Sequence, residues 1–364
     1  MAAELYIGLM SGTSLDGVDA ALVQIGDGEL QFLSSAYQPY PQDVRAAALA
    51  LHTPGPDDLH HASLLANRVA ELYAQAVAEL LDSAGTEARH IKAIGAHGQT
   101  VRHNPAAGYT LQLINPALLA ELSGITTIAD FRNRDIAAGG QGAPLVPAFH
   151  DAMLRHPNEH RVVLNLGGIA NITDLAPGRP TRGFDTGPGN MLLDAWIQQQ
   201  RGLSYDENGA WGATGKASEG LLTRLLAHPY LKQSPPKSCG REEFNLAWLQ
   251  SCLDDSDTAE DVQASLVELS ARSIADAIRT HCGRPDALLA CGGGARNLHL
   301  MDALSRNLPD TKVSTTDTAG LDGDALEAIA FAWLAQRTIH GLSGNLPEVT
   351  GARGERILGA IYPV

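Results

Sequence analysis

Gly183-Phe184-Asp185-Thr186-Gly187-Pro188-Gly189-Asn190 holds a single carboxylate between glycines, where a strand is expected to give way to a helix. Before it, residues 161–168 read Arg-Val-Val-Leu-Asn-Leu-Gly-Gly, an apolar β-branched strand that ends in glycine, and after it residues 191–196 have helical spacing. We therefore expect a sharp turn at Asp185. Glycines in such a turn let backbone N–H groups approach a phosphate, and the N-terminus of the next helix favours negative charge.

Asp185 is the unusual residue in this turn. A carboxylate there repels phosphate unless it binds a metal or accepts a proton from a nucleophile, so Asp185 is a candidate catalytic base. An Asp before a helix also serves as an N-cap, and this stretch alone leaves both interpretations open. Gly167, Gly168 and Gly187 are candidate phosphate contacts around it.

A second glycine-containing turn lies near the N-terminus. Residues 5–10 and 17–25 predict two strands of a hairpin, joined through the small residues Ser11, Gly12, Thr13 and Ser14. Their N–H and hydroxyl groups can bind a polyphosphate, with Asp16 or Asp19 close enough to hold Mg²⁺ through water, although a plain polar turn is the simpler interpretation. Residues 162–175 repeat this layout. The repeat predicts two related lobes that hold phosphate between their turns.

The expected boundary between the lobes is Pro157-Asn158-Glu159, which divides the chain into residues 1–156 and 157–364. The tail, residues 341–364, is expected to pack across the lobes. The stretch 204–256 has glycines and a Pro-Pro pair without a clear period, and it is interpreted as an accessory insertion around the substrate.

Three further segments supply candidate contacts. His97 follows an expected strand at 91–96, Arg132 lies in the charged, glycine-containing segment 130–144, and Glu327 lies in an expected helix at 324–334. Arg132 and Arg134, both in the segment 130–144, suit an anionic substrate group. A hydrogen-bonded structural histidine and a solvated loop with internal salt bridges are the alternatives. The glycines 292–294 follow an expected strand at 287–290, and they form either a tight turn or a surface for a flat ring or phosphate.

Composition narrows the class of function. The 364 residues carry 26 Lys and Arg against 41 Asp and Glu, a net charge of -15, which argues against binding nucleic acid or an anionic membrane. A hydrophobic content of 44% fits a two-domain α/β enzyme. Without a signal peptide or an apolar run of membrane-spanning length, we expect a soluble cytoplasmic protein. The sequence has neither a P-loop nor a G-x-G-x-x-G pattern, which disfavours P-loop NTPases and ordinary dinucleotide enzymes.

Four motifs together resemble one family. They are Gly8-Leu9-Met10-Ser11-Gly12-Thr13-Ser14-Leu15-Asp16-Gly17, His97-Gly98-Gln99-Thr100, Phe184-Asp185-Thr186-Gly187-Pro188-Gly189-Asn190 and Cys291-Gly292-Gly293-Gly294. With residues 130–147 and 236–241, they are similar to the 1,6-anhydro-N-acetylmuramic acid kinases. This resemblance covers essentially the whole chain. It implies the two-lobed α/β fold of hexokinase, actin and the heat-shock chaperones, which is ribonuclease H-like, with the active site in the cleft between the lobes.

The resemblance also implies roles for individual residues. Asp185 would be the general base that activates water while the anhydro ring opens and O6 accepts a phosphoryl group from ATP. The expected ATP contacts are the phosphate segment Ser11, Gly12, Thr13, Ser14, Leu15, Asp16, Gly17 and Val18, the turn residues Gly167, Gly168 and Gly187, and the adenosine segment Gly292, Gly293 and Gly294. Asp16 would lie near Mg²⁺, and His97, Arg132 and Glu327 would contact the sugar. Leu9 and Met10 stand where the wider superfamily often has an Asp, which leaves the metal role of Asp16 less secure.

The product implied is N-acetylmuramate 6-phosphate, made during recycling of the bacterial cell wall, by a homodimer. Two other functions remain open from the residues. A nucleotide-gated interaction protein would turn over ATP without sugar, and an ordinary sugar kinase would use Asp185 to deprotonate a hydroxyl group.

Overall fold

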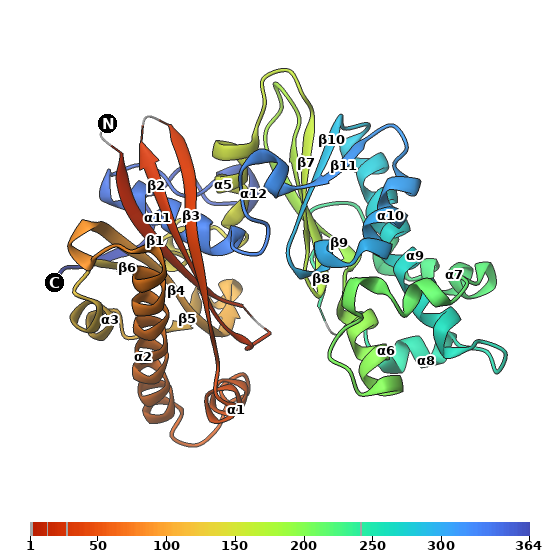
Figure 1. Cartoon of the computed structure of the whole chain (residues 1–364), viewed down its shortest axis with the longest axis horizontal. Helices are drawn as coiled ribbons and strands as arrows, with labels where there is room; N and C mark the ends of the chain where they lie inside the picture. Colours follow the sequence, from red (N-terminus) through yellow and green to blue (C-terminus); the bar gives the residue numbers. More distant parts are fainter. Residues whose placement is uncertain (1–2, 13, 27, 241) are drawn as a thin grey trace. The chain divides into compact units, whose positions relative to one another are not determined.

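The computed structural model describes residues 3–12, 14–26, 28–240 and 242–364. The chain forms two compact units (Figure 1). Unit 1 consists of residues 1–153 and 325–364, and unit 2 of residues 154–324. Among the described residues, no helix is long and apolar enough to cross a membrane.

Unit 1 is built on a mixed sheet. Its strands are β1 (Glu4–Ser11), β2 (Gly17–Gly26), β3 (Glu29–Pro39), β4 (Ile91–Asn104), β5 (Tyr109–Leu113), β6 (Thr127–Ala129) and β12 (Ala360–Tyr362). They run in the order β12-β6-β4-β1-β2-β3, with β5 beside β4. The hairpin strands β1, β2 and β3 are antiparallel, whereas β4 is parallel to both β1 and β6.

The helices of unit 1 cover both faces of this sheet. They are α1 (Gln42–Ala50), α2 (Asp58–Ala84), α3 (Pro116–Ser123), α4 (Asn133–Ala137), α5 (Val146–Leu154), α11 (Leu326–Ile339) and α12 (Pro347–Thr350), with short turns η1 (Ala88–His90) and η2 (Pro105–Ala107). Successive residues of a strand point to opposite faces. Ile7 and Leu9 therefore share a core with α2, while Gly8 between them faces the backbone of α11.

Unit 2 repeats the same plan. Its sheet has the order β11-β10-β7-β8-β9, from β7 (Arg161–Leu166), β8 (Ile169–Leu175), β9 (Arg182–Pro188), β10 (Ala287–Cys291) and β11 (Lys312–Thr315). Strands β7, β8 and β9 are antiparallel, and β10 is parallel to β7 and β11. Its helices are α6 (Met191–Arg201), α7 (Glu219–Leu226), α8 (Leu246–Cys252), α9 (Ala259–Ala277) and α10 (Leu298–Asn307). The short 3₁₀ helices are η3 (Glu207–Gly209), η4 (Gly212–Thr214), η5 (Pro229–Lys232), η7 (Gly293–Arg296) and η8 (Thr316–Ala319), and η6 (Ile278–Cys282) is a short π-helix.

Both units thus contain three consecutive antiparallel strands with two parallel strands beside the first of them. The spatial order is β9-β8-β7-β10-β11 in unit 2 and β3-β2-β1-β4-β6 in unit 1, where β5 and β12 are additional antiparallel strands. This is the ribonuclease H-like topology, so the expected α/β fold class is confirmed. The repeat of the first hairpin in residues 162–175 is confirmed as β7 and β8.

The division of the chain differs from the expected one at its C-terminal side. Residues 325–364 belong to unit 1, whereas the sequence suggested a second lobe running from 157 to 364. The reason is packing, since α11 contacts β1, β2 and β4, and β12 pairs with β6. The sequence pattern predicts the helix at this position, but it does not show which of the two sheets the helix packs against.

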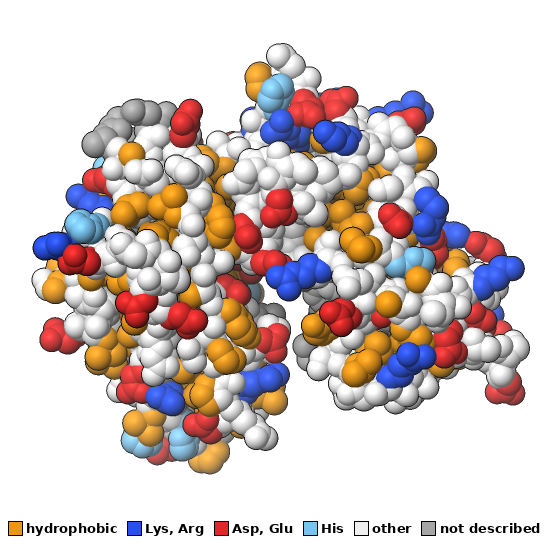
Figure 2. Space-filling view, viewed as in Figure 1, with side chains coloured by type: hydrophobic (Ala, Val, Ile, Leu, Met, Phe, Trp, Pro, Cys, Tyr) orange, Lys and Arg blue, Asp and Glu red, His pale blue; other side chains and the backbone are white. Residues whose placement is uncertain are grey.

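Two motifs also lie in different local structure from that expected. Asp185 is within β9, paired with Asn171 of β8, and the chain turns four residues later, so the N-cap of α6 is Asn190. His97 lies inside β4, because that strand continues to Asn104 instead of ending near 96. On the face shown in Figure 2, acidic and basic side chains are interspersed over both units.

Candidate functional site

Asp185 is held by main-chain and side-chain contacts of unit 2. Its N–H donates to the carbonyl of Lys237 at 3.2 Å, and its carbonyl accepts the hydroxyl of Tyr230 at 3.0 Å. Its carboxylate oxygen Oδ2 accepts the N–H of Cys239 at 3.1 Å. A backbone donor therefore orients the carboxylate without neutralising it.

The surroundings of Asp185 favour proton uptake. Burial raises the pKa of the Asp185 carboxyl above its ordinary value, while the N–H of Cys239 and the charge of Lys237 act in the opposite direction. A carboxylate with a raised pKa is a stronger base than one in water. The arrangement suits a general base.

The turn between β7 and β8 is tied to the start of α6. The carbonyl of Gly167 accepts the N–H of Asn190 at 2.9 Å, and that of Gly168 accepts the N–H of Gly189 at 2.9 Å and of Met191 at 3.1 Å. The N–H groups that were expected to favour a phosphate at this helix start are therefore partly occupied. Gly187 has a φ of 151°, which side chains rarely adopt, and a Cβ there would lie 2.8 Å from the Leu231 side chain, so a larger residue would be strained at this position.

The three glycines after β10 differ in their surroundings. A Cβ on Gly292 would lie 2.5 Å from Asn165, and one on Gly294 would lie 2.7 Å from Asn190, whereas Gly293 faces open space. Because β10 is parallel to β7 and Cys291 pairs with Asn165, this turn lies beside the end of β7. It borders a small depression also lined by Ala295, Arg296, Thr315, Asp317, Gly323 and Asp324. The open backbone of Gly293 can contact a ligand.

The phosphate segment of unit 1 divides into buried and exposed residues. Ser11 is buried, and its hydroxyl lies 2.8 Å from that of Tyr73 and donates to the carbonyl of Gly98 at 3.1 Å. The backbone of Leu15 has a left-handed φ of 61°, while the buried side chains of Leu15 and Val18 belong to the core. The start of β2 at Gly17 is also buried. Thr13 lies outside the described residues.

Gly12, Ser14 and Asp16 are the more accessible members of this segment. The carbonyl of Gly12 accepts the side-chain amide of Gln99 at 3.2 Å, which ties the turn to β4. Asp16 forms an exposed ion pair with Arg45 at 3.4 Å. A group of three or more His, Cys, Asp or Glu that could hold a metal does not occur among the described residues.

His97, Arg132 and Glu327 lie together in unit 1. The Arg132 Nε donates to His97 Nε2 at 3.0 Å, and a second guanidinium nitrogen donates to the carbonyl of Gly142 at 2.9 Å. Burial and then the charge of Arg132 lower the pKa of His97 well below its ordinary value, so His97 is a neutral acceptor. Burial also lowers the pKa of Arg132 to about 10, opposed by the charge of Glu327. This partly buried cation is suited to an anionic ligand group.

Two groups of residues that support these sites were not found by sequence reasoning. Asp135 is fully buried and accepts the N–H of Gly142 at 2.8 Å and the side chains of Asn345 and Thr350 at 2.7 Å each. It fixes the loop whose carbonyl binds Arg132. The second group is Tyr230, Lys237 and Cys239 around Asp185. Neither group could be found from a pattern of neighbouring residues, because the partners in each group are far apart in the sequence. Residues 236–241 did contribute to the family resemblance.

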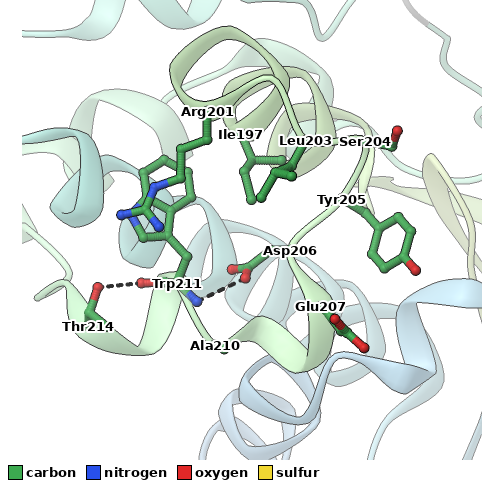
Figure 3. Close-up of a pocket in the computed structure, with 10 residues that line it drawn as sticks. All are labelled: Ile197, Arg201, Leu203, Ser204, Tyr205, Asp206, Glu207, Ala210, Trp211 and Thr214. Carbon is green, nitrogen blue, oxygen red and sulfur yellow. Dashed lines mark hydrogen bonds between the residues drawn. The ribbon is translucent and has the colours of Figure 1, made fainter.

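A separate pocket of about 520 Å³ lies in unit 2, lined by Ile197, Arg201, Leu203, Ser204, Tyr205, Asp206, Glu207, Ala210, Trp211 and Thr214 (Figure 3). The Arg201 guanidinium lies 4.5 Å from the centre of the Trp211 ring. Asp206 accepts the N–H of Trp211 at 2.9 Å and that of Gly212 at 2.8 Å. The residues expected at the functional site are not part of this lining.

Two ribonuclease H-like units, each with a glycine-containing turn after its first strand, define the class of phosphotransferases and ATPases that includes the sugar kinases. The model of one family, described as anhydro-N-acetylmuramic acid kinase, matches residues 4–364. A relative with that name from Thiobacillus denitrificans is 56% identical over 365 residues, covering 99% of this chain and 98% of its own. Another from Bordetella avium is 56% identical over 362 residues, covering 98% and 96%. The chain belongs to the anhydro-N-acetylmuramic acid kinase family and is a sugar kinase.

Proposed function

We propose that the protein uses ATP and water to convert 1,6-anhydro-N-acetylmuramic acid into N-acetylmuramate 6-phosphate and ADP. The observation that carries this proposal is the partly buried carboxylate of Asp185, held by the N–H of Cys239 in a β9 segment that matches the family motif. The names of the relatives support the substrate.

In the proposed step Asp185 accepts a proton from water as the water oxygen bonds to the anomeric carbon. The bond between that carbon and O6 breaks, and O6 attacks the γ-phosphorus while the bond to ADP breaks. At the end of the step one proton from water is on Asp185, the remaining hydroxyl group is on the anomeric carbon, and the phosphoryl group is on O6. An in-line displacement needs O6 and the departing oxygen on opposite sides of phosphorus, so positioning supplies most of the rate.

Unit 1 supplies the proposed sugar contacts. Arg132 would bind the lactyl carboxylate, because a guanidinium donates two parallel hydrogen bonds to a carboxylate. The neutral His97 and the loop carbonyl of Gly142 fix the orientation of the guanidinium. Glu327 acts electrostatically on Arg132 and would contact the same sugar.

ATP would contact the segment from Ser11 to Val18, Gly167 and Gly168 in the turn between β7 and β8, and Gly187 near the end of β9, with its adenosine over Gly293. Mg²⁺ is usually bound by one or two carboxylates together with substrate phosphates. The exposed Asp16 fits a water-mediated contact of this kind better than a cage made by the protein alone. When bound, Mg²⁺ would neutralise charge on the phosphates.

A labelling experiment tests the proposed step. The anhydro sugar is turned over in ¹⁸O-water, and the product is analysed promptly beside an unreacted control because a reducing sugar exchanges its anomeric oxygen slowly. We expect one label on the anomeric oxygen and none in the phosphoryl group. Label in free phosphate would indicate a simple ATPase, and unlabelled sugar phosphate would indicate an ordinary hydroxyl kinase.

A panel of open and anhydro amino sugars, assayed for ADP release, tests the substrate itself. The proposed biological role is recycling of cell-wall sugar in the cytoplasm, by a homodimer. Sedimentation analysis of the purified protein tests the dimer, and a single species of about 38 kDa would contradict it.

A further inference from the structure

One segment of unit 2, residues 230–239, contacts Asp185 in three places. Tyr230 donates its hydroxyl to the Asp185 carbonyl, Lys237 accepts the Asp185 N–H through its own carbonyl, and the N–H of Cys239 bonds the carboxylate. The segment begins in η5 and belongs to the insertion between α6 and α9. Both main-chain groups and the carboxylate of Asp185 therefore depend on it.

The side chain of Lys237 turns back over this segment. Its Nζ lies 4.7 Å from the centre of the Tyr230 ring and 3.5 Å from the Tyr230 carbonyl. A cation over an aromatic face is attracted by the ring, which holds the ammonium beside the tyrosine whose hydroxyl binds the Asp185 carbonyl. Lys237 is only partly exposed, so its charge is screened less than that of a surface lysine.

The charges of Lys237 and Asp185 act on each other. Burial is the largest influence on both groups: it raises the pKa of Asp185 and lowers the pKa of Lys237. The positive charge of Lys237 lowers the pKa of Asp185, and the negative charge of Asp185 raises that of Lys237. Each charge thus stabilises the ionised form of the other against burial.

We propose that Lys237 is a positioning residue for the reaction, whose ammonium, fixed over Tyr230, keeps the Asp185 carboxylate ionised and ready to accept a proton. This inference rests on the proposed role of Asp185 as the base. Lys237 itself need not touch substrate. Its effect is to extend the activity of the base toward lower pH, because a buried carboxylate without a nearby cation would be protonated sooner.

The other titratable groups around this pair do not supply the same charge. Burial raises the pKa of the Cys239 thiol to about 12, so it is neutral, and burial also raises the pKa of Tyr230. Glu243 faces both of these groups and is acidic. His281, which faces Lys237 and Arg182, has its pKa lowered first by burial and then by those cations. Within the described part of the chain, Lys237 is the side-chain cation that favours ionised Asp185.

The test compares Lys237→Met, Lys237→Arg and the matched control Lys232→Met, which removes an exposed lysine from the same segment. In Lys237→Met we expect the acid limb of the kcat/KM profile to move up by about one pH unit, as loss of a nearby opposite charge predicts. At acidic pH the variant is then about tenfold slower than wild type, and it recovers toward wild type as pH rises. For Lys237→Arg and Lys232→Met we expect the acid limb of the kcat/KM profile to stay at the wild-type pH.

A direct titration separates this inference from the proposed function. The pKa of the Asp185 carboxyl is followed by ¹³C NMR of aspartate-labelled protein, with Asp185→Asn to assign the signal. An unchanged carboxyl pKa in Lys237→Met overturns the role of Lys237. If the carboxyl pKa rises in Lys237→Met but the acid limb of the kcat/KM profile does not move, Asp185 is not the base. That outcome also overturns the role of Lys237 in the reaction.

The stability of each variant is checked by thermal unfolding. A purely structural role would lower kcat/KM equally at all pH values, and that result also overturns the proposal. If Lys237→Met proves unstable, Lys237→Gln removes the same charge with a polar stem and is titrated in its place.

Discussion

At the scale of single residues, the largest predicted effect on turnover is that of replacing the carboxylate of Asp185. In Asp185→Asn the amide can still accept the N–H of Cys239, so we expect the fold and nucleotide binding to persist. Turnover should fall about 10²- to 10⁴-fold, because an amide cannot accept a proton from water. Steady-state assays of ADP release measure the loss, and calorimetric titration of ATP is the control. Near-normal turnover by a folded variant would remove Asp185 from the role of base.

A second carboxylate of unit 2, Asp194, predicts a pH dependence of stability. Burial and then the charge of Asp206 raise the pKa of Asp194 to about 7. In the unfolded chain its pKa returns to about 3.9. Because the folded value is higher, its contribution to stability is fully present below about pH 4 and is lost as pH rises through about 7, at up to about 1.4 kcal/mol per pH unit.

Urea unfolding of wild type and Asp194→Asn at several pH values checks this. The free energy of unfolding of the variant, relative to wild type, should rise between about pH 4 and 7 and stay constant above that window. Asp255→Asn changes an exposed carboxylate of the same unit and is the matched control. A difference between Asp194→Asn and wild type that does not vary with pH would show that Asp194 titrates normally.

At the scale of elements, the glycine turn between β10 and α10 divides into packing and binding positions. Gly293→Val should weaken ATP binding while leaving sugar binding unchanged, because its new side chain enters open space where the nucleotide is proposed to lie. Gly294→Ala should instead lower the free energy of unfolding by about 1–3 kcal/mol, since its Cβ meets Asn190 and Leu166. Separate calorimetric titrations of the two ligands and thermal unfolding distinguish the outcomes. Unchanged ATP affinity in Gly293→Val would mean that the turn has no binding role.

Elements with a local signal were predictable from the sequence. Apolar residues at helical spacing between positions 56 and 81 predict a helix closed by Gly85; this helix is α2, and Gly85 ends it with a left-handed φ of 61°. Asn115-Pro116 and Gly124 predict the start and end of a second helix; this helix is α3, where the Asn115 side chain accepts the N–H of Leu118 at 3.1 Å. Both follow from apolar spacing and from residues that cap helix ends.

Strand β9 could not be predicted in the same way. Its residues, Arg-Gly-Phe-Asp-Thr-Gly-Pro, are poor in β-formers, and it exists because β8 pairs with it. The contacts of Asp185 with Tyr230, Lys237 and Cys239 likewise join residues 45 to 54 positions apart. The sequence identified the carboxylate but not the environment that sets its charge.

At the scale of the whole molecule, unit 1 depends on chain segments from both ends of the sequence. Helix α11 packs on β1 and β4, and its backbone approaches the sheet closely because Gly8 and Gly95 have no side chains. The sequence predicted this helix but assigned it to the other lobe, since nothing near residue 326 indicates that its partners are glycines more than 200 positions earlier. Gly8 and Gly95 are therefore the residues that allow α11 to pack directly against the sheet.

The last prediction follows from that close approach. In Gly95→Ala the added methyl group would lie 2.8 Å from the carbonyl carbon of Phe331 and 3.1 Å from Ala335, with backbone that cannot rotate away. We expect the free energy of unfolding to fall by about 1–3 kcal/mol or more, the cost of overpacking a well-filled core. Gly220→Ala in α7 is the matched control, because its Cβ would meet nothing closer than 3.8 Å and alanine favours a helix. Urea and thermal unfolding of both variants measure the effect. If Gly95→Ala were as stable as Gly220→Ala, α11 would not be docked directly against β4, and the assignment of residues 325–364 to unit 1 would have to rest on the contacts of α11 with β1 and β2 and on the pairing of β12 with β6.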